Sequence, residues 1–335
     1  MIAEEPPLDP GRTIIDPHLH HWEIFAHSGQ QPQRFLFDEA RAEIAASGQA
    51  VACSVYVECG QMYRPDGPPE LRPLGETEFA TGLAAMAASG AYGPCRLAHR
   101  IVGAIDLTSA NAAAVIEAHQ RVAGERFRGV RTNTAFSEGG LFGFPCDPAL
   151  RELVASTAFR AGAAELAARD LSLDVWCLDS QLALVAALAD RLPDMAIVVD
   201  HCATPDPAGP ADPGARLALW AGRLREVARR PNVHVKIGGL GMDVTGPLAP
   251  RSGPASSAQL AERWRPLVET CIDIFTPARA MFESNFPPDR AAATYGATWN
   301  AFKRLAAALS EDEQDALFRG TAARVYRISE APAAG

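Results

Sequence analysis

The sequence predicts a single-domain α/β protein folded as a (β/α)8 barrel, the TIM barrel, and three observations lead to that prediction. Eight short apolar runs recur along the 335 residues, segments with helical spacing separate them, and the loops after the runs are longer than those before them. Parallel strands require helical crossovers, and eight strand–helix units close into a barrel. We expect the barrel to span 13–328, between a flexible N-terminal segment, 1–12, and a flexible tail, 329–335.

The predicted strands are runs of apolar and β-branched residues bounded by turn residues. In chain order they are 13–18, 51–58, 100–106, 129–133, 171–177, 196–201, 232–238 and 280–285. The helices predicted between and after them are 38–46, 75–90, 109–122, 148–169, 180–191, 215–229, 259–275 and 293–308. An open doubly wound sheet is the alternative, but the glycine-rich phosphate loop typical of that fold does not follow the first strand.

Four strand-to-helix loops are long and rich in Gly and Pro. They read GQMYRPDGPPELRPLG after the second strand, AFSEGGLFGFPCDP after the fourth, CATPDPAGPADPG after the sixth and GLGMDVTGPLAPRSGPASS after the seventh. Helix-to-strand connections are short, as at Leu192-Pro193-Asp194. Loops at the carboxyl ends of barrel strands build the active site in this architecture, so we expect function there.

Composition and charge exclude several classes of partner. The formal charge is −9, and no run of Lys or Arg could neutralise a row of phosphates, so we expect no nucleic-acid partner. No apolar stretch is long enough to span a bilayer, and the acidic, proline-rich start lacks the features of a secretory signal. Seven scattered Cys without a C-x-x-C pair indicate reduced thiols and a cytoplasmic protein. The oligomeric state stays open, a homo-oligomer included.

Three histidines are placed to meet at the mouth of the barrel. In TIIDPHLHHW, Asp16, His18 and His20 alternate and should project together into the interior, and the sixth strand ends at His201. A His pair on a strand is often only a polar rim, but burying three unpaired imidazoles for packing alone would be costly. Neutral imidazole binds divalent metals and titrates near neutral pH, so the trio predicts a metal site or a proton-transfer site.

Four segments together resemble the amidohydrolase-related barrel family, which includes 2-pyrone-4,6-dicarboxylate lactonases and sugar lactonases. They are His18-Leu19-His20, Val199-Asp200-His201, VKIGGL at 235–240 and MFESNFP at 281–287. The resemblance implies a (β/α)8 hydrolase that attacks a lactone or, less often, an amide or a carboxylated ring. It also implies one divalent metal ion, with zinc the first choice, or none, and no organic cofactor. Zinc held by His18, His20 and His201 with an open water position would be chemically sensible.

Two positions depart from the family's pattern. Where the family has an Asp at the end of the eighth strand, this chain has Asn285, which cannot accept a proton at neutral pH. Glu283, two residues earlier on the same face, is the substitute, although it could instead be a buried partner of Lys236 or of an arginine. The fourth strand carries Arg131 and Asn133 in place of the lysine of two-metal relatives, so a two-metal centre is not expected.

Several residues near the mouth are candidates for substrate binding. The Arg131 guanidinium could hold a substrate carboxylate through two hydrogen bonds, and Asn133 shares its strand face. Glu58 closes the second strand, and the loop behind it contains Tyr63, Arg64 and Arg72. Charged residues in such positions are often only solvated, so their placement after a strand is what favours a role. The partner that we expect is a small anionic substrate.

The function that the sequence predicts is hydrolysis of a lactone, or a related cyclic ester, of a carboxylated small molecule in the catabolism of aromatic or sugar acids. The histidines would polarise the carbonyl, and Glu283 or a histidine would take the proton. Asn285 would orient the water or donate to the oxyanion. Two alternatives stay open: a metal-dependent decarboxylase of an aromatic or unsaturated acid, and a barrel without catalysis.

Overall fold

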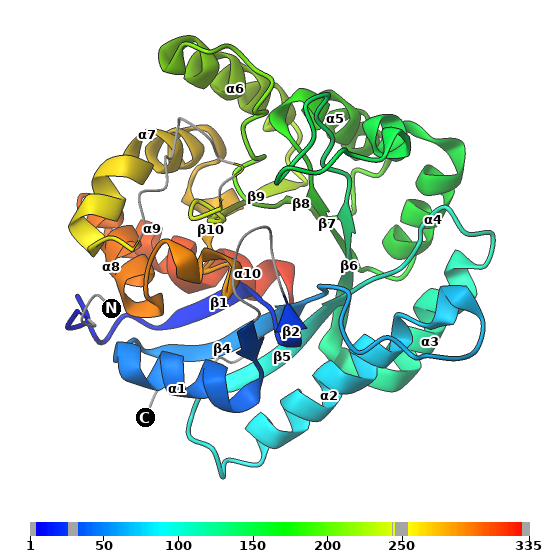
Figure 1. Cartoon of the computed structure of the whole chain (residues 1–335), viewed down its shortest axis with the longest axis horizontal. Coiled ribbons are helices and arrows are strands. Elements are labelled where there is room, and N and C mark those ends of the chain that lie inside the picture. Colours follow the sequence, from blue (N-terminus) through cyan, green and yellow to red (C-terminus); the bar gives the residue numbers. More distant parts are fainter. Residues whose placement is uncertain (1–4, 26–32, 243, 245–253, 330–335) are drawn as a thin grey trace.

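A parallel sheet of eight strands forms the centre of the protein, and helices surround it (Figure 1). The computed structural model describes residues 5–25, 33–242, 244 and 254–329. Each strand pairs in parallel with the next one in this order, as a succession of strand–helix units requires. The strands are β1 (Ile14–Leu19), β4 (Val51–Val57), β5 (Arg96–Gly103), β6 (Phe127–Asn133), β7 (Ser172–Trp176), β8 (Ile197–Val199), β9 (Val233–Ile237) and β10 (Ala280–Phe282).

The two end strands of the sheet meet and bring it close to a closed barrel. Leu19 at the end of β1 forms a parallel bridge with Phe286, and the His20 N–H donates to the Phe286 carbonyl at 2.9 Å. The Ser284 N–H donates to the Asp16 carboxylate at 3.1 Å. The predicted (β/α)8 barrel is therefore confirmed, and all eight predicted strands are present.

Two strands that lead to site residues are shorter than predicted. β8 ends at Val199 and β10 at Phe282, whereas the apolar runs predicted strands to 201 and 285. The chain leaves the extended conformation there, because His201 has a φ of 54° and Asn285 a φ of 50°. Positive φ is uncommon for residues with a side chain, and such positions gather at functional sites. The backbone thus turns sharply at the mouth of the barrel.

Each strand is followed by a helix that packs on the outside of the sheet (Figure 1). The predicted helix at 148–169 is divided into a 3-10 segment, Pro148–Ala155, and a helix whose N-cap is Ser156, which accepts from the Phe159 N–H. The other predictions match single helices. The helices are α1 (Phe37–Ser47), α2 (Leu74–Ala88), α3 (Ala112–Ala123), α4 (Thr157–Ala167), α5 (Leu182–Arg191), α6 (Pro213–Val227), α7 (Ser257–Phe275) and α8 (Tyr295–Ala306).

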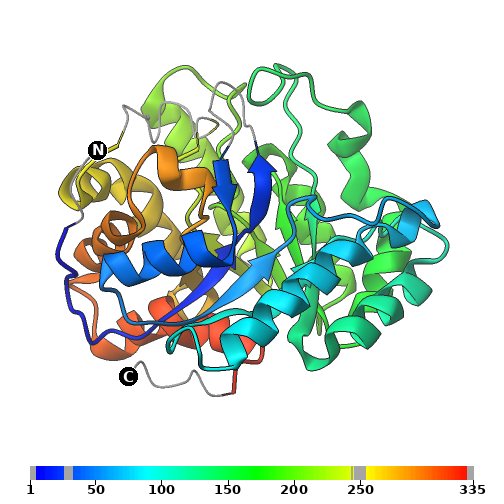
Figure 2. The ribbon, with the colours of Figure 1, turned by 60° about the horizontal axis from the view of Figure 1, so that its bottom comes forward.

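Two elements were not predicted, and they lie at opposite ends of the barrel (Figure 2). An antiparallel hairpin of β2 (Trp22–Phe25) and β3 (Gln33–Phe35) follows β1 directly at the mouth. At the other end the chain closes with α9 (Glu311–Asp315), a π-helical turn (Ala316–Gly320) and α10 (Thr321–Val325). The sequence held a signal for α9, because Ser310 and Glu313 form a capping box.

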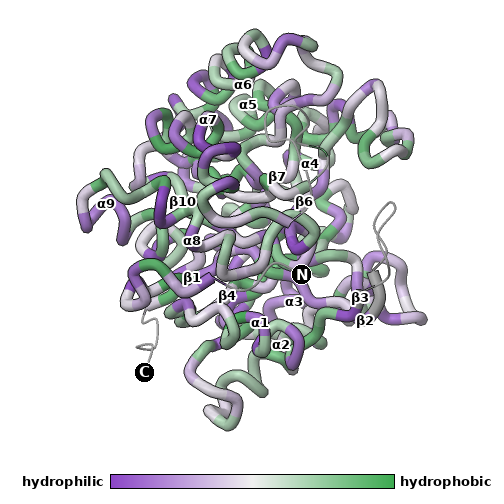
Figure 3. The backbone as a smooth tube through the Cα atoms, turned by 60° about the vertical axis from the view of Figure 1, so that its left-hand side comes forward, coloured by the Kyte–Doolittle hydropathy of each residue, from purple (hydrophilic) through white to green (hydrophobic). Residues whose placement is uncertain are grey.

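The interior below the mouth is apolar and reaches the C-terminal helix. Ile15, Val55, Val198 and Met281 from four strands pack with Tyr326, which follows α10. A second and larger core lies between the strands and the outer helices. The acidic helix α9 is hydrophilic and lies at the edge of the molecule in Figure 3. In the described part of the chain, none of the helices combines the length and the apolar character that a membrane span needs.

The described part of the N-terminal segment is attached to α8. The Leu8 N–H donates to the Asn300 side chain at 2.8 Å, and Lys303 donates to the carbonyls of Leu8 and Asp9 at 2.6 and 2.8 Å. Glu5 accepts from Ser257 at the start of α7. Buried amide and ammonium groups on the helices satisfy the backbone of this segment, which residue composition alone does not reveal. Residues 1–4 and 330–335 lie outside the described residues.

Candidate active site

The first strand positions two histidines at the mouth and turns Asp16 away from them. Between Asp16 and Leu19, β1 has one residue more than its partner β4, which is a β-bulge at Pro17 and His18. The bulge shifts the alternation, so the expectation that Asp16 shares a face with His18 and His20 is wrong. Asp16 instead accepts from Ser284 Oγ at 2.6 Å and from the Tyr295 hydroxyl of α8 at 3.0 Å.

The hydrogen bonds of His20 determine the proton positions of both histidines. His20 Nδ1 lies 2.8 Å from the Val57 carbonyl, which can only accept, so Nδ1 carries the proton. Burial lowers the pKa of His20 to about 3, so the ring is neutral and its Nε2 is an acceptor. His18 Nε2 lies 3.1 Å from that atom and must therefore donate to it. Burial, helped by Lys236, also holds the pKa of His18 well below its usual value, so His18 Nδ1 keeps a lone pair, and Lys236 Nζ lies 3.1 Å from it.

Glu283 joins the two strands that carry His18 and His201. Its Oε1 lies 2.6 Å from His201 Nδ1, and its Oε2 lies 2.9 Å from His18 Nδ1. Burial works to raise the pKa of Glu283, but His201 and His18 together lower it to about 2. Burial likewise works to lower the pKa of His201, yet Glu283 raises it. The Glu283 carboxylate therefore stays ionised between two imidazoles.

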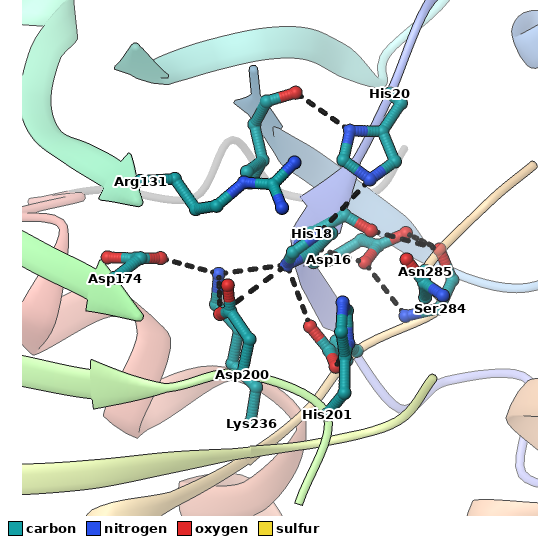
Figure 4. Close-up of polar contacts among 12 residues, drawn as sticks. Asp16, His18, His20, Arg131, Asp174, Asp200, His201, Lys236, Ser284 and Asn285 are labelled. Atoms are coloured by element: carbon teal, nitrogen blue, oxygen red, sulfur yellow. Dashed lines mark hydrogen bonds and ion pairs between the residues drawn. The ribbon is translucent and has the colours of Figure 1, made fainter. Parts of the chain in front are cut away.

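A buried lysine completes the charged cluster on the side of β7 and β9. Lys236 Nζ lies 2.7 Å from Asp174, 3.3 Å from Asp200 and 3.1 Å from His18 Nδ1 (Figure 4). All of these side chains are fully buried. Burial alone would lower the pKa of Lys236, but Asp174 and Asp200 raise it, so the group is an ammonium. The sequence analysis also considered Glu283 as a partner of Lys236. The closest contacts of Glu283 are instead with His18 and His201.

The cluster fits a divalent cation by its charge and by its donor atoms. Three carboxylates, those of Glu283, Asp174 and Asp200, lie against the single ammonium of Lys236 and beside His201, whose pKa Glu283 raises. The lone pair of His18 Nδ1 faces a carboxylate oxygen at 2.9 Å, an arrangement that a cation stabilises. His18, His201 and Glu283 offer ligand atoms that lie within 4.8 Å of one another. Two imidazoles and a carboxylate are ligands that zinc prefers, and three of them leave a position open for water.

Two of the three predicted metal ligands, His18 and His201, belong to this group, and the third lies beside it. His20 Nε2 is 3.1 Å from His18 Nε2 and therefore on the other side of the His18 ring from Glu283. For His18 and His20 to bind one ion together, the His18 Nε2 proton would have to leave. His20 as a metal ligand thus stays a prediction. Glu283 belongs to the group of possible ligands, and its spacing from Met281 on β10 indicates the inward direction of its side chain.

Asn285 holds a carboxylate that the sequence analysis did not select. Its Nδ2 donates to Asp289 Oδ1 at 2.8 Å, and the Gly241 N–H donates to Asp289 Oδ2 at 3.0 Å. Burial raises the pKa of Asp289 to about 7. Gly241 leaves room for this carboxylate, because a side chain there would meet Asp289 Cγ at 3.0 Å. The signal in the sequence was the Asp four residues after Asn285, in NFPPD.

Arg131 reaches the mouth already paired with Glu58. Arg131 Nε lies 2.6 Å from Glu58 Oε1, and Nη2 donates to the Glu58 carbonyl at 2.7 Å. Behind them Glu76 of α2 accepts from the Tyr56 hydroxyl and from the Cys59 and Gln61 N–H groups, at 2.8–3.1 Å. These bonds fix the start of the loop after β4. The structure thus brings two predicted substrate-binding residues together as a nearly buried, neutral pair.

The other predicted substrate-binding residues lie nearer the surface. The Asn133 side chain is exposed and accepts from the Ala135 N–H, which shapes the start of the loop after β6. Tyr63 is 40 % exposed, and Arg64 forms an ion pair with Glu78 of α2. Arg72 is exposed as well. None of these contacts joins them to His18, His201 or Glu283.

Aromatic rings form a wall beside His201. The Trp176 ring lies 6.0 Å from His201 and 6.0 Å from Phe142 in the loop after β6, and Trp176 Nε1 donates to Thr204 at 3.1 Å. A ring held by its own hydrogen bond is a rigid apolar surface for a small ligand. The mouth therefore combines a charged centre, a neutral ion pair and an apolar wall.

Comparisons with known proteins agree with this geometry. The profile of the amidohydrolase family matches residues 15–328. The uncharacterized protein y4mH of Sinorhizobium fredii is 30% identical over 94% of this chain and 99% of its own length. The L-fucono-1,5-lactonase of Burkholderia multivorans is 35% identical over 54% of this chain and 60% of its own length, and that of Burkholderia ambifaria is 26% identical over 94% and 95%.

Solved structures share the fold. An amidohydrolase of Burkholderia multivorans with bound zinc has a TM-score of 0.71 and 28% identity, over 94% of this chain and 99% of its own. A 2-pyrone-4,6-dicarboxylic acid hydrolase of Pseudomonas putida, at 16% identity and a TM-score of 0.63, shows the shared fold alone, over 95% of this chain and 99% of its own. With a family match along nearly its whole length, this chain belongs to the amidohydrolase family.

Proposed function

We propose that this protein is a metal-assisted hydrolase that opens the ring of a small lactone. The observation that carries the proposal is the group of His18, His201 and Glu283, buried at the carboxyl ends of β1, β8 and β10 in a cluster with three carboxylates and one ammonium. Relatives named L-fucono-1,5-lactonases, one of them aligned over nearly the whole chain, favour a lactone as the substrate.

The residues of this centre would hold one divalent ion, zinc first, through His18 Nδ1, His201 and Glu283. When bound, such an ion polarises a carbonyl and lowers the pKa of a water molecule. His20 fixes the tautomer of His18 by accepting from its Nε2, so the lone pair at Nδ1 faces the cluster. Trp176 would form an apolar wall beside the ligand group, because its ring makes an edge contact with that of His201 at 6.0 Å.

The proton acceptor that we propose is Asp289. The sequence analysis favoured Glu283 or a histidine, but a carboxylate with a pKa of about 2 is a weak base, and Glu283 is already shared by two imidazoles. The pKa of Asp289 is raised by burial to about 7, which matches the requirement of general base catalysis at neutral pH. Asn285 would then orient this carboxylate rather than act on water itself.

For the substrate, the pair of Arg131 and Glu58 favours a hydroxylated lactone over a carboxylated one. Glu58 neutralises the guanidinium, so a substrate carboxylate would have to compete with it at 2.6 Å. Hydroxyl groups could donate to Glu58 and accept from the Arg131 guanidinium without displacing either residue. This proposal revises the expectation that Arg131 holds an acid group.

The test is a panel of hydroxylated and carboxylated lactones, assayed for ring opening with the purified protein before and after chelation. We expect turnover of hydroxylated lactones that is lost with the metal and restored by zinc. A decarboxylase would release carbon dioxide from an aromatic acid without opening a ring, and a barrel without catalysis would turn over none of these compounds. Either result would contradict the proposed function.

A further inference from the structure

We propose that the Lys236 ammonium is the second cation of the charged cluster and holds the place that a second divalent ion would take. It would thereby limit the centre to one ion. The inference rests on the metal centre proposed above, and it concerns a residue to which the proposed reaction gives no task.

The position of Lys236 is that of a bridging cation. Its Nζ lies within 3.3 Å of Asp174 on β7, of Asp200 just after β8 and of the His18 Nδ1 lone pair on β1 (Figure 4). Carboxylate oxygens, here those of Asp174 and Asp200, are also common ligands of a divalent metal, whereas the one lone pair of His18 Nδ1 belongs to the ion proposed above. Because His18 Nδ1 faces Glu283 as well, the ammonium and the proposed ion would be direct neighbours.

The two carboxylates depend on this ammonium for charge compensation. Neither oxygen of Asp200 has a hydrogen-bond donor among the described residues, and the contacts of its Oδ1 are with Lys236 and, at 3.7 Å, with His18. Asp174 is held from below by the Tyr326 hydroxyl at 2.6 Å and by Ser172 Oγ at 3.2 Å. Both side chains are fully buried, where an uncompensated charge is costly.

Removal of the ammonium should therefore open a second metal position. In Lys236→Ala the space of the side chain becomes free, and three carboxylates face a single divalent ion. Three carboxylates and one divalent ion leave one negative charge, which a second divalent ion between Asp174 and Asp200 with one bound hydroxide would compensate. Two ions in neighbouring sites of this kind lie about 3.5–4 Å apart, close enough for their electron spins to couple.

The experiment measures metal content and the spectrum of bound Mn²⁺, neither of which depends on turnover. After dialysis against Mn²⁺ we expect one ion per chain in the wild type and a spectrum of an isolated ion. Lys236→Ala should bind two ions per chain and give a spin-coupled spectrum, and Lys236→Arg, which keeps the charge, should bind one. A Lys236→Ala protein that folds and binds one ion overturns the proposal.

A double variant covers the case in which Lys236→Ala does not fold. Lys236→Ala with Asp174→Asn removes one charge of each sign, so we expect it to fold and to bind one ion. Failure of the double variant to restore folding would show that charge balance is not the role of Lys236 and would overturn the proposal. A wild type that binds no divalent ion would instead contradict the metal centre itself, so the two failures can be told apart.

Discussion

Two charged regions share the mouth of the barrel, and they differ in their balance. The centre around His18 and Glu283 has three carboxylates and one ammonium, all fully buried. The pair of Glu58 and Arg131 has one charge of each sign, at 12% and 11% side-chain exposure. We call the centre around His18 and Glu283 the unbalanced region and the pair of Glu58 and Arg131 the balanced region. The unbalanced region is suited to bind a cation, and the balanced region is suited to bind the polar groups of a neutral substrate.

The variant Glu283→Gln tests this difference between the two regions most strongly, because it keeps the shape of the side chain and removes the charge of one ligand. We expect metal affinity to fall by more than the roughly 10–100-fold typical of losing an outer-shell partner. Ring opening should fall by about 10³-fold, on the scale of losing a main electrostatic group. Metal content and kcat/KM measure both effects. Glu226→Gln on the surface is the control, and a Glu283→Gln protein with wild-type metal content would contradict the account.

The second prediction concerns the base beside the unbalanced region. Asp289→Asn should lower kcat by about 10²-fold, at the lower end of the effect of general base catalysis. Because the pKa of Asp289 is about 7, wild-type activity should fall as the pH drops through that value, when the carboxylate becomes protonated. The variant should lack this acid limb. A pH–rate profile measures it, and an unchanged limb in Asp289→Asn would assign the base to another residue.

In the balanced region, Glu58→Gln leaves the Arg131 charge without its partner. We expect the ratio of kcat/KM for carboxylated over hydroxylated lactones to rise by about 10–100-fold, since the guanidinium becomes free for a substrate carboxylate. Arg131→Met is the matched control and should raise KM for both classes. An unchanged ratio in Glu58→Gln would mean that the ion pair does not select the substrate.

The last prediction concerns stability alone, through a buried histidine that belongs to neither region. His21 stacks on Phe35 and Tyr56, and burial lowers its pKa to about 4. The unfolded chain takes up a proton below about pH 6.5 and the folded one only near pH 4, so stability should fall as the pH drops between these values. The loss at this site is about 3 kcal/mol. Urea unfolding at pH 7 and pH 4 should show a smaller loss in His21→Phe, and equal losses would refute the assignment.

The sequence was sufficient to predict the barrel, because the patterns that indicate strands and helices are local and recur along the chain. Each strand is an apolar run, each crossover has helical spacing, and the order of the strands follows from the chain alone. The hairpin after β1 was missed because β2 and β3 are only four and three residues long. The helices after Ser310 were missed although a capping box marked their start. These helices cover the end of the barrel opposite the mouth, and their position there depends on tertiary contacts such as that of the Tyr326 hydroxyl with Asp174.

The sequence predicted only those site residues whose positions follow from the ends of the strands. Strand order brings His18, His201 and Glu283 to one mouth, and spacing from Met281 placed Glu283 inward. A single extra residue in β1 turned Asp16 outward, and no pattern in TIIDPHLHHW marks the bulge apart from Pro17. The pairing of Arg131 with Glu58 and the closeness of Lys236 to His18 are distances between strands, which one sequence does not contain.

Ring opening by the metal-free protein is the measurement that tests the central claim most directly. The wild type is stripped with a chelator, its metal content is verified, and turnover of a hydroxylated lactone is followed before and after one equivalent of zinc. The account predicts one ion per chain before stripping, loss of activity with the ion and recovery with zinc. Full activity in the stripped protein would contradict it and would make His201, with Glu283 at 2.6 Å, a direct acid–base pair.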